Sequence, residues 1–231
     1  SQSSTARART NDRTRIDLSH VVEDGMTTYP GLPAPIVCDY LTRERSRDVY
    51  APGTEFQIGV VTLCANTGTY VDSPFHRYPD GIDLSELPLD RLADLDAITI
   101  DATGSGREIG VEAFASRDVA GRAVIVRTGW SRHWRTPEYT TGHPFLTEEA
   151  AVHLASAGAL LVGIDSLNID DTPPHGPRPV HSVLLAAGIP ICEHLADLSP
   201  LPVDGFRFSA VPVKVKGMGT FPVRAYATIE R

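Results

Sequence analysis

Asn66-Thr67-Gly68-Thr69-Tyr70-Val71-Asp72-Ser73-Pro74-Phe75-His76 is the stretch around which this sequence is organised. It directly follows residues 56–64, whose β-branched side chains predict a strand. Gly68 and Pro74 give the backbone after this strand an irregular course that directs Asp72 and His76 inward. Closely spaced polar and ionisable groups at the end of a rigid strand indicate a functional site.

The rest of the chain alternates predicted strands with two predicted helices. Strands are expected at 97–101, 123–127, 160–164, 208–215 and 225–229. A helix should begin after Thr147 as N-cap and stop at Gly158, and a second should run from Pro179 to Gly188. His181 lies one turn before Leu184, so its ring should face the interior. This mixture indicates an α/β fold.

Length and composition favour a single folded domain. The chain has 231 residues, of which 42% are hydrophobic and 22% charged, as in globular proteins. Residues 1–14 are polar, Arg-rich and without apolar periodicity, which predicts a disordered N-terminal tail. Residues 15–231 are then expected to form the catalytic domain.

Charge and cysteine content restrict the partners and the compartment. The formal net charge is −8, and such a field repels nucleic acid and anionic lipid. No apolar run is long enough to cross a bilayer, so no membrane partner is expected. Three cysteines without a C-x-x-C pair favour a reducing cytoplasm.

Gly104-Ser105-Gly106 lacks a third glycine, which argues against a dinucleotide cofactor.

The stretch 66–76 resembles the signature H-x-G-T-H-x-D-x-P-x-H of the cyclase family, which includes kynurenine formamidases and isatin hydrolases. Further family-like segments are found at 17–20, 29–31, 127–130, 163–166, 181–185, 193–195 and 222–224. The resemblance extends over the chain from Ile16 onward. It implies the swivelling β/β/α fold of that family, and a homodimer or higher homo-oligomer whose subunits complete the site together.

The resemblance also implies a metal site and a reaction. The family's ligand positions fall on Asp72, His181 and Glu193, with His76 as the last signature histidine. Asn66 and Tyr70 replace the first two signature histidines, and an amide or a phenol is a weaker zinc ligand than an imidazole. One divalent ion, Zn²⁺ or Mn²⁺, is therefore expected at Asp72, His181, Glu193, His76 and Asn66, and a second is not.

The expected activity is hydrolysis of a small amide, formamide or lactam, with His76, Glu193 and Tyr70 as catalytic groups. The sequence leaves open whether this small-molecule substrate is aromatic. Two alternatives remain. One is a repurposed cyclase or dehydratase that uses acid–base catalysis without a metal. The other is an inactive homologue that binds a ligand in the same pocket.

Overall fold

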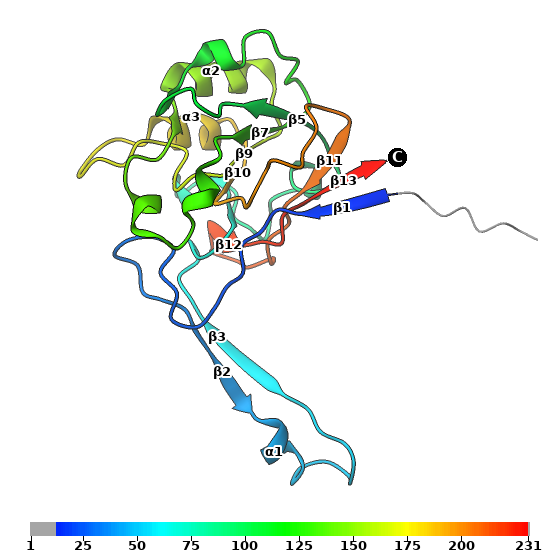
Figure 1. The fold of residues 1–231 in the computed structure, drawn as a ribbon. Coiled ribbons are helices and arrows are strands. Elements are labelled where there is room, and N and C mark those ends of the chain that lie inside the picture. Colours follow the sequence, from blue (N-terminus) through cyan, green and yellow to red (C-terminus); the bar gives the residue numbers. More distant parts are fainter. Residues whose placement is uncertain (1–12, 231) are drawn as a thin grey trace, which may run out of the picture.

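The computed structural model describes residues 13–230, and within them nine strands form one mixed sheet (Figure 1). Strands β5, β7, β9 and β10 are parallel neighbours in its centre, and antiparallel strands complete both sides. In spatial order the strands are β1 (Arg13–Asp17), β13 (Tyr226–Glu230), β11 (Phe206–Ser209), β5 (Leu95–Asp101), β7 (Ala123–Arg127), β9 (Leu161–Ile164), β10 (Ile191–Glu193), β4 (Tyr70–Asp72) and β12 (Thr220–Pro222).

Two helices cover one face of this sheet. Helix α2 (Glu148–Ala157) begins at Thr147, whose side chain accepts a hydrogen bond from the Ala150 N–H, and ends at Gly158 in the left-handed conformation. Helix α3 (Pro179–Ala186) packs beside it. Short elements complete the body: strands β6 (Glu108–Ile109) and β8 (Phe145–Leu146) and 3-10 helices η1 (Pro74–His76), η2 (Leu89–Arg91), η3 (Val111–Ala113), η4 (Trp130–His133) and η5 (Pro137–Thr140).

Both faces of the central strands are buried, as parallel strands require. Val124 and Val126 of β7 point to the core beneath α2 and α3, whereas Ala123 and Ile125 point to the opposite core. The curl of the sheet closes this second core, where β5 and β7 meet side chains of β11 and β13. The sequence-based prediction of a single α/β domain is confirmed.

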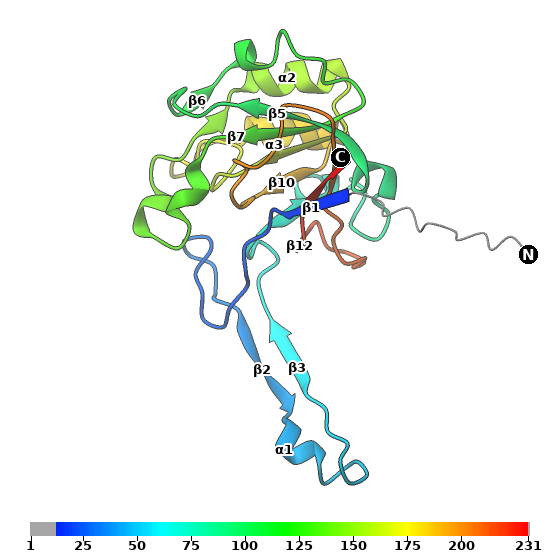
Figure 2. The same ribbon diagram turned by 45° about the vertical axis from the view of Figure 1, so that its right-hand side comes forward.

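A two-stranded arm extends away from the body in both views (Figures 1 and 2). The arm comprises residues 36–62: strand β2 (Ile36–Leu41), helix α1 (Arg43–Ser46) and strand β3 (Ile58–Thr62), with β2 and β3 antiparallel. Among residues 13–230, its strands pair only with each other. The predicted strand at 56–64 is therefore present in shortened form, but it lies in this arm and not beneath the site.

Two further expectations need correction. The strand predicted at 208–215 is present only as Phe206–Ser209, because the Ala210 N–H donates to the Leu92 carbonyl of a loop and Pro212 has no N–H with which to resume a sheet ladder. The expected tail lies mostly outside the described residues. Its last two residues, Arg13 and Thr14, belong to β1 and pair with β13. Within residues 13–230, no helix combines the length and apolar character that a membrane span needs.

Candidate functional site

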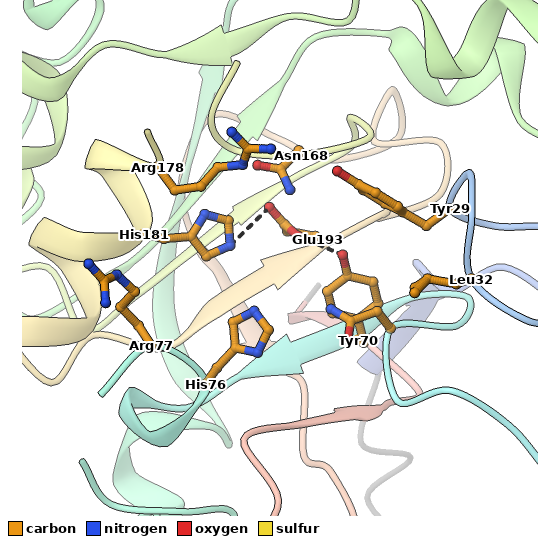
Figure 3. A pocket seen from close by; sticks show the side chains of 10 residues that line it. Tyr29, Leu32, Tyr70, His76, Arg77, Asn168, Arg178, His181 and Glu193 are labelled. Atoms are coloured by element: carbon orange, nitrogen blue, oxygen red, sulfur yellow. Dashed lines mark hydrogen bonds and ion pairs between the residues drawn. The ribbon is translucent and has the colours of Figure 1, made fainter. Parts of the chain in front are cut away.

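The site lies where strands β4 and β10 meet helix α3. Tyr70 and Asp72 lie on β4, and Glu193 on β10 is the antiparallel partner of Tyr70. Helix α3 contributes His181, and η1 ends at His76. Tyr70, His76, His181 and Glu193 line a common cavity of about 240 Å³, and Figure 3 shows their side chains around it. The fold thus brings together residues that are more than a hundred positions apart in sequence.

Asp72 is the fully buried centre of the site. Its Oδ1 accepts a hydrogen bond from the Thr220 hydroxyl, and its Oδ2 has no hydrogen-bond partner among residues 13–230. The Nε2 atom of His181 lies 3.5 Å from Oδ2, and that of His76 lies 3.8 Å from Oδ1. Burial disfavours the carboxylate, but His181 and His76 together keep the pKa of Asp72 below its ordinary value.

Thr220 also fixes the orientation of His76. The Thr220 Oγ1 lies 3.0 Å from His76 Nδ1. Because the hydroxyl donates its hydrogen to Asp72, it accepts one from Nδ1. A neutral His76 ring bonded in this way carries its lone pair on Nε2, which lies 3.8 Å from Asp72 Oδ1.

Asp170 holds His181 from behind. One Asp170 oxygen lies 2.7 Å from His181 Nδ1, and the carboxylate also accepts the backbone N–H groups of Val180 and His181 at 2.7 and 2.9 Å. These bonds satisfy the first turn of α3 and direct Nε2 to the cavity. Burial alone would lower the pKa of His181, but the carboxylates of Glu193, Asp170 and Asp72 raise it to about 10.

Glu193 is buried between two hydrogen-bond donors. Tyr70 donates its hydroxyl to Oε2 at 2.7 Å, and the Ile169 N–H donates to Oε1 at 2.6 Å. Burial raises the pKa of Glu193 to about 7, despite the opposing charge of His181. Burial and the charge of Glu193 raise the pKa of Tyr70 well above its ordinary value, so the phenol keeps its proton.

The donor set fits one divalent cation. Ligand atoms of Asp72, His76 and His181 all lie within 4.8 Å of one another. Asp72 Oδ2 is a buried anionic oxygen that accepts no hydrogen bond from residues 13–230 and faces the His181 ring at 3.5 Å, whose compensating charge a bound ion would replace. Two imidazole nitrogens and one carboxylate oxygen form a ligand set suited to zinc or manganese. Both Glu193 oxygens already accept hydrogen bonds, and its role as a ligand remains a prediction.

Other predicted residues lie around this centre. Asn66 lines the cavity, and Tyr70 is its neighbour there. His194 is buried with its ring centroid 5.1 Å from that of Tyr70, and burial lowers the pKa of His194 to about 3. The ring of His20 stacks on Trp134 at 3.9 Å. These neutral histidines support the site from outside the cavity.

Several residues of the site were not identified from the sequence. Asp170 and Thr220 orient the two histidines, and the cavity wall also includes Tyr29, Leu32, Arg77, Asn168 and Arg178. Asp170 left a weak signal, because it is an acidic residue shortly before a proline-rich segment and a helix. The arginines resemble ordinary surface charges in sequence.

The sequence and the fold of this chain are similar to those of known proteins. Residues 16–171 match the cyclase family. A kynurenine formamidase from Geobacillus thermodenitrificans is 26% identical over 91% of this chain and 95% of its own length. An isatin hydrolase bound to a product analogue superimposes with a TM-score of 0.80 at 20% identity, over 95% of this chain and 94% of that one. A potential metal-dependent hydrolase with cyclase activity has a TM-score of 0.77 at 24% identity, over 95% and 99% of the two chains.

The family match spans more than half of the sequence, and the chain belongs to the cyclase family.

Proposed function

We propose that this protein hydrolyses the carbon–nitrogen bond of a small amide, formamide or lactam, in the manner of an arylformamidase. The observation that carries the proposal is the buried, unpartnered Asp72 Oδ2 beside the Nε2 atoms of His181 and His76. The similarity to proteins named kynurenine formamidase, over nearly the whole length of both chains, supports the same reaction class.

Asp72, His76 and His181 would hold a single Zn²⁺ or Mn²⁺ ion. When bound, such an ion supplies a water that ionises near neutral pH and a positive charge beside the substrate carbonyl. Asn66 and Tyr70 provide no imidazole for a second ion, and Tyr70 is already bonded to Glu193. The proposed centre therefore holds one metal.

Glu193 acts as the proton carrier in this proposal. With a pKa of about 7, it takes a proton from the attacking water and returns it to the leaving nitrogen as the carbon–nitrogen bond breaks. Tyr70 and the Ile169 N–H hold the carboxylate in place through one oxygen each. The more exposed His76 has its Nδ1 bonded to Thr220 and would offer its Nε2 to the ion.

The test is release of the amine from an aryl formamide and ring opening of a lactam by zinc- or manganese-supplemented protein. We expect turnover by the wild type and loss of at least about a hundredfold in His181→Asn, which removes one ligand. Rates that are equal for the wild type and this variant would count against the proposal.

A metal-free acid–base reaction is the second candidate, and the Tyr70–Glu193 hydrogen bond favours it. A neutral phenol joined to a carboxyl group with a pKa of about 7 forms a donor–acceptor pair of the kind that cyclisations and dehydrations use. Complete chelation separates the candidates, because only the hydrolase described above loses its activity.

We further propose that the arm, residues 36–62, packs against a second copy of the chain. Among residues 13–230, nine of the eighteen exposed large hydrophobic side chains lie in the arm, with exposures of 37–70%. They are Ile36, Val37, Tyr40, Val49, Tyr50, Phe56, Ile58, Val60 and Val61. An isolated two-stranded ribbon is marginally stable in water, so a surface of this kind needs a cover.

The chemistry of the arm favours an identical partner. Its tip carries basic residues, among them Arg43 and Arg45, beside the acidic Glu44 and Asp48, so the tip can be complementary to itself in a two-fold contact. The arm leaves the body after Leu32 and returns before Asn66, and both residues line the cavity. A second copy on the arm would therefore lie close to the mouth of the site.

A further inference from the structure

Three consecutive residues, Asn168, Ile169 and Asp170, lie against the working groups of the site. The Ile169 N–H donates to Glu193 Oε1 at 2.6 Å, and Asp170 lies 2.7 Å from Nδ1 of His181. The peptide bond that joins Asn168 to Ile169 is therefore in direct contact with Glu193. Asn168 lines the same cavity, but it has no part in holding the metal or moving the proton as described above.

The oxygen of the Asn168 side-chain amide is fixed by a local hydrogen bond. Its Oδ1 accepts the Asp170 N–H at 2.9 Å, which leaves the nitrogen Nδ2 at the opposite end. Only the oxygen of an amide can accept an N–H, so the two ends are assigned by this contact. Figure 3 shows the nitrogen of Asn168 on the side of the cavity and of Glu193.

The Asn168 nitrogen keeps its two N–H donors for a ligand. Within residues 13–230, the Asn168 side chain makes one hydrogen bond, the one through Oδ1, although only 7% of the residue is exposed. Two other polar groups at the cavity already have protein partners, since Tyr70 donates to Glu193 and His76 Nδ1 to Thr220. A nearly buried amide nitrogen needs an acceptor, and a molecule bound in the cavity supplies one.

Amide hydrolysis creates such an acceptor beside Glu193. The oxygen of the attacking water bonds to the carbonyl carbon, Glu193 takes one proton of that water, and the carbonyl oxygen gains negative charge. As the carbon–nitrogen bond breaks, the carbonyl forms again and Glu193 returns the proton to the leaving nitrogen. The buried carboxylate of Asp72 disfavours a further negative charge in the site, so donors must face the carbonyl oxygen.

We propose that Asn168 is a catalytic residue whose Nδ2 donates a hydrogen bond to the carbonyl oxygen of the substrate as negative charge develops on it. This rests on the proposed function of the cavity as an amide hydrolase site. The substrate then lies with its carbonyl oxygen toward Asn168 and its carbonyl carbon beside Glu193. Because the bond between Oδ1 and the Asp170 N–H holds the amide in place, the donor is oriented before the substrate binds.

Asn168→Ser and Asn168→Ala separate this role from support of the loop. A serine hydroxyl still accepts the Asp170 N–H but leaves no donor at the position of Nδ2, whereas alanine loses both. Both variants should lose about a hundredfold in kcat for formanilide with little change in KM, because the bond strengthens in the transition state. Thr172→Ala, in the same segment but outside the cavity lining, is the control and should match the wild type.

The zinc affinity and the pH profile of Asn168→Ser distinguish a substrate contact from a structural one. Both should equal those of the wild type, because the contacts of Asp170 with His181 and of Ile169 with Glu193 remain. Wild-type kcat in Asn168→Ser would show that the residue only supports the loop. A shifted acidic limb of its kcat/KM profile would show that the amide acts on Glu193. Either result overturns the proposal.

Acetophenone, a ketone with no carbon–nitrogen bond to break, provides a readout without turnover. Difference infrared spectroscopy of the zinc-loaded proteins should give a lower carbonyl stretching frequency for the ketone bound to the wild type than to Asn168→Ser, because a hydrogen bond weakens the carbonyl bond. Equal frequencies, or no ketone bound to the wild type, overturn the proposal. Absence of formanilide hydrolysis by the wild type refutes the hydrolase function, while the ketone spectra still decide the role of Asn168.

Discussion

The hydroxyl of Tyr70 donates a 2.7 Å hydrogen bond to Oε2 of Glu193, and the two residues are direct partners across strands β4 and β10. The family signature has a histidine at position 70, so a phenol in this chain occupies a place that an imidazole fills in the family pattern. The bond secures the carboxylate and occupies one of its two oxygens.

Replacing Tyr70 with phenylalanine should shift the pH dependence of activity. The phenol stabilises the ionised form of Glu193, so its removal should raise the pKa of Glu193 above about 7. The acidic limb of the kcat/KM profile then moves to higher pH, and a shift of the pKa from about 7 to about 8 lowers activity at pH 7 by about fivefold. Tyr139→Phe is the control, since Tyr139 is an equally buried tyrosine whose hydroxyl contacts His194. Superimposable profiles for the wild type and Tyr70→Phe would contradict this role.

Asp170→Asn should weaken metal binding without removing a ligand. Asp170 contacts Nδ1 of His181 and accepts two N–H groups of α3, and loss of such a supporting carboxylate commonly costs about 10–100-fold in affinity. The neighbouring Asp171→Asn is the control, because Asp171 contacts Arg107 instead. Competition with a chromophoric chelator measures both variants. Equal affinities would mean that Asp170 acts only on the helix.

Metal binding should release protons at neutral pH. The pKa of His181 is about 10 without an ion, so its ring is protonated at pH 7, and Nε2 must lose its proton to become a ligand. We expect release of about one proton per ion and a decrease in affinity of about tenfold for each unit that the pH falls. Calorimetry in two buffers of different ionisation enthalpy counts the protons. A binding enthalpy independent of the buffer would exclude this displacement.

The same groups predict how the metal-free protein responds to pH. The folded-state pKa of His181 is above 6.5, so its contribution to stability is complete below pH 6.5 and is lost as the pH rises through about 10. The folded-state pKa of Glu193 is raised from 4.5 to about 7, and the folded protein therefore loses stability between these values as the pH rises. The buried His20 and His194, whose pKa values are lowered to about 4 and 3, oppose the effect of Glu193 below about pH 6.5, so the clear signal lies at higher pH. The Tm of metal-free protein should decrease from about pH 7 to pH 10, and saturating zinc should reduce this decrease. A Tm that rises over this range would contradict the assignment of His181.

A charged side chain in the arm should dissociate the proposed dimer. Val61 is 55% exposed on β3, and Val203 is 56% exposed on the body, so Val61→Asp and Val203→Asp form a matched pair. Light scattering should give the wild type and Val203→Asp twice the 24.9 kDa chain mass, and Val61→Asp the monomer mass. A monomeric wild type, or a dimer of Val61→Asp as stable as that of Val203→Asp, would show that the arm does not form the contact.

Local signals made part of the fold predictable. Helix α2 was placed correctly because Thr147 and Gly158 mark its ends through their own chemistry. The strand at 58–62 was predicted, but its place in the arm was not. β-Branched residues indicate that a segment is extended, but they do not indicate which sheet it joins. Strand β4 has only three residues, too few for a periodic pattern to reveal.

The sequence predicted those residues of the candidate site that belong to a recognisable motif. Asp72, His76, His181 and Glu193 were identified through the family signature and its later segments, and the fold brings them together. Thr220 was missed because it reaches Asp72 from a strand 148 positions away. Arg178 was missed because nothing in the sequence distinguishes an arginine at a cavity from one in solvent. Such contacts exist only once the sheet has assembled.

The most direct test of this account is titration of exhaustively chelated protein with Zn²⁺, followed by calorimetry and by activity, for the wild type and Asp72→Asn. The wild type should bind one ion per chain, and amide hydrolysis should be abolished by chelation and restored as the site fills. Asp72→Asn should lose most of this binding, because it replaces the unpartnered anionic oxygen with an uncharged amide. Full activity of the chelated wild type without detectable metal, or equal zinc binding by Asp72→Asn, would contradict the proposed centre.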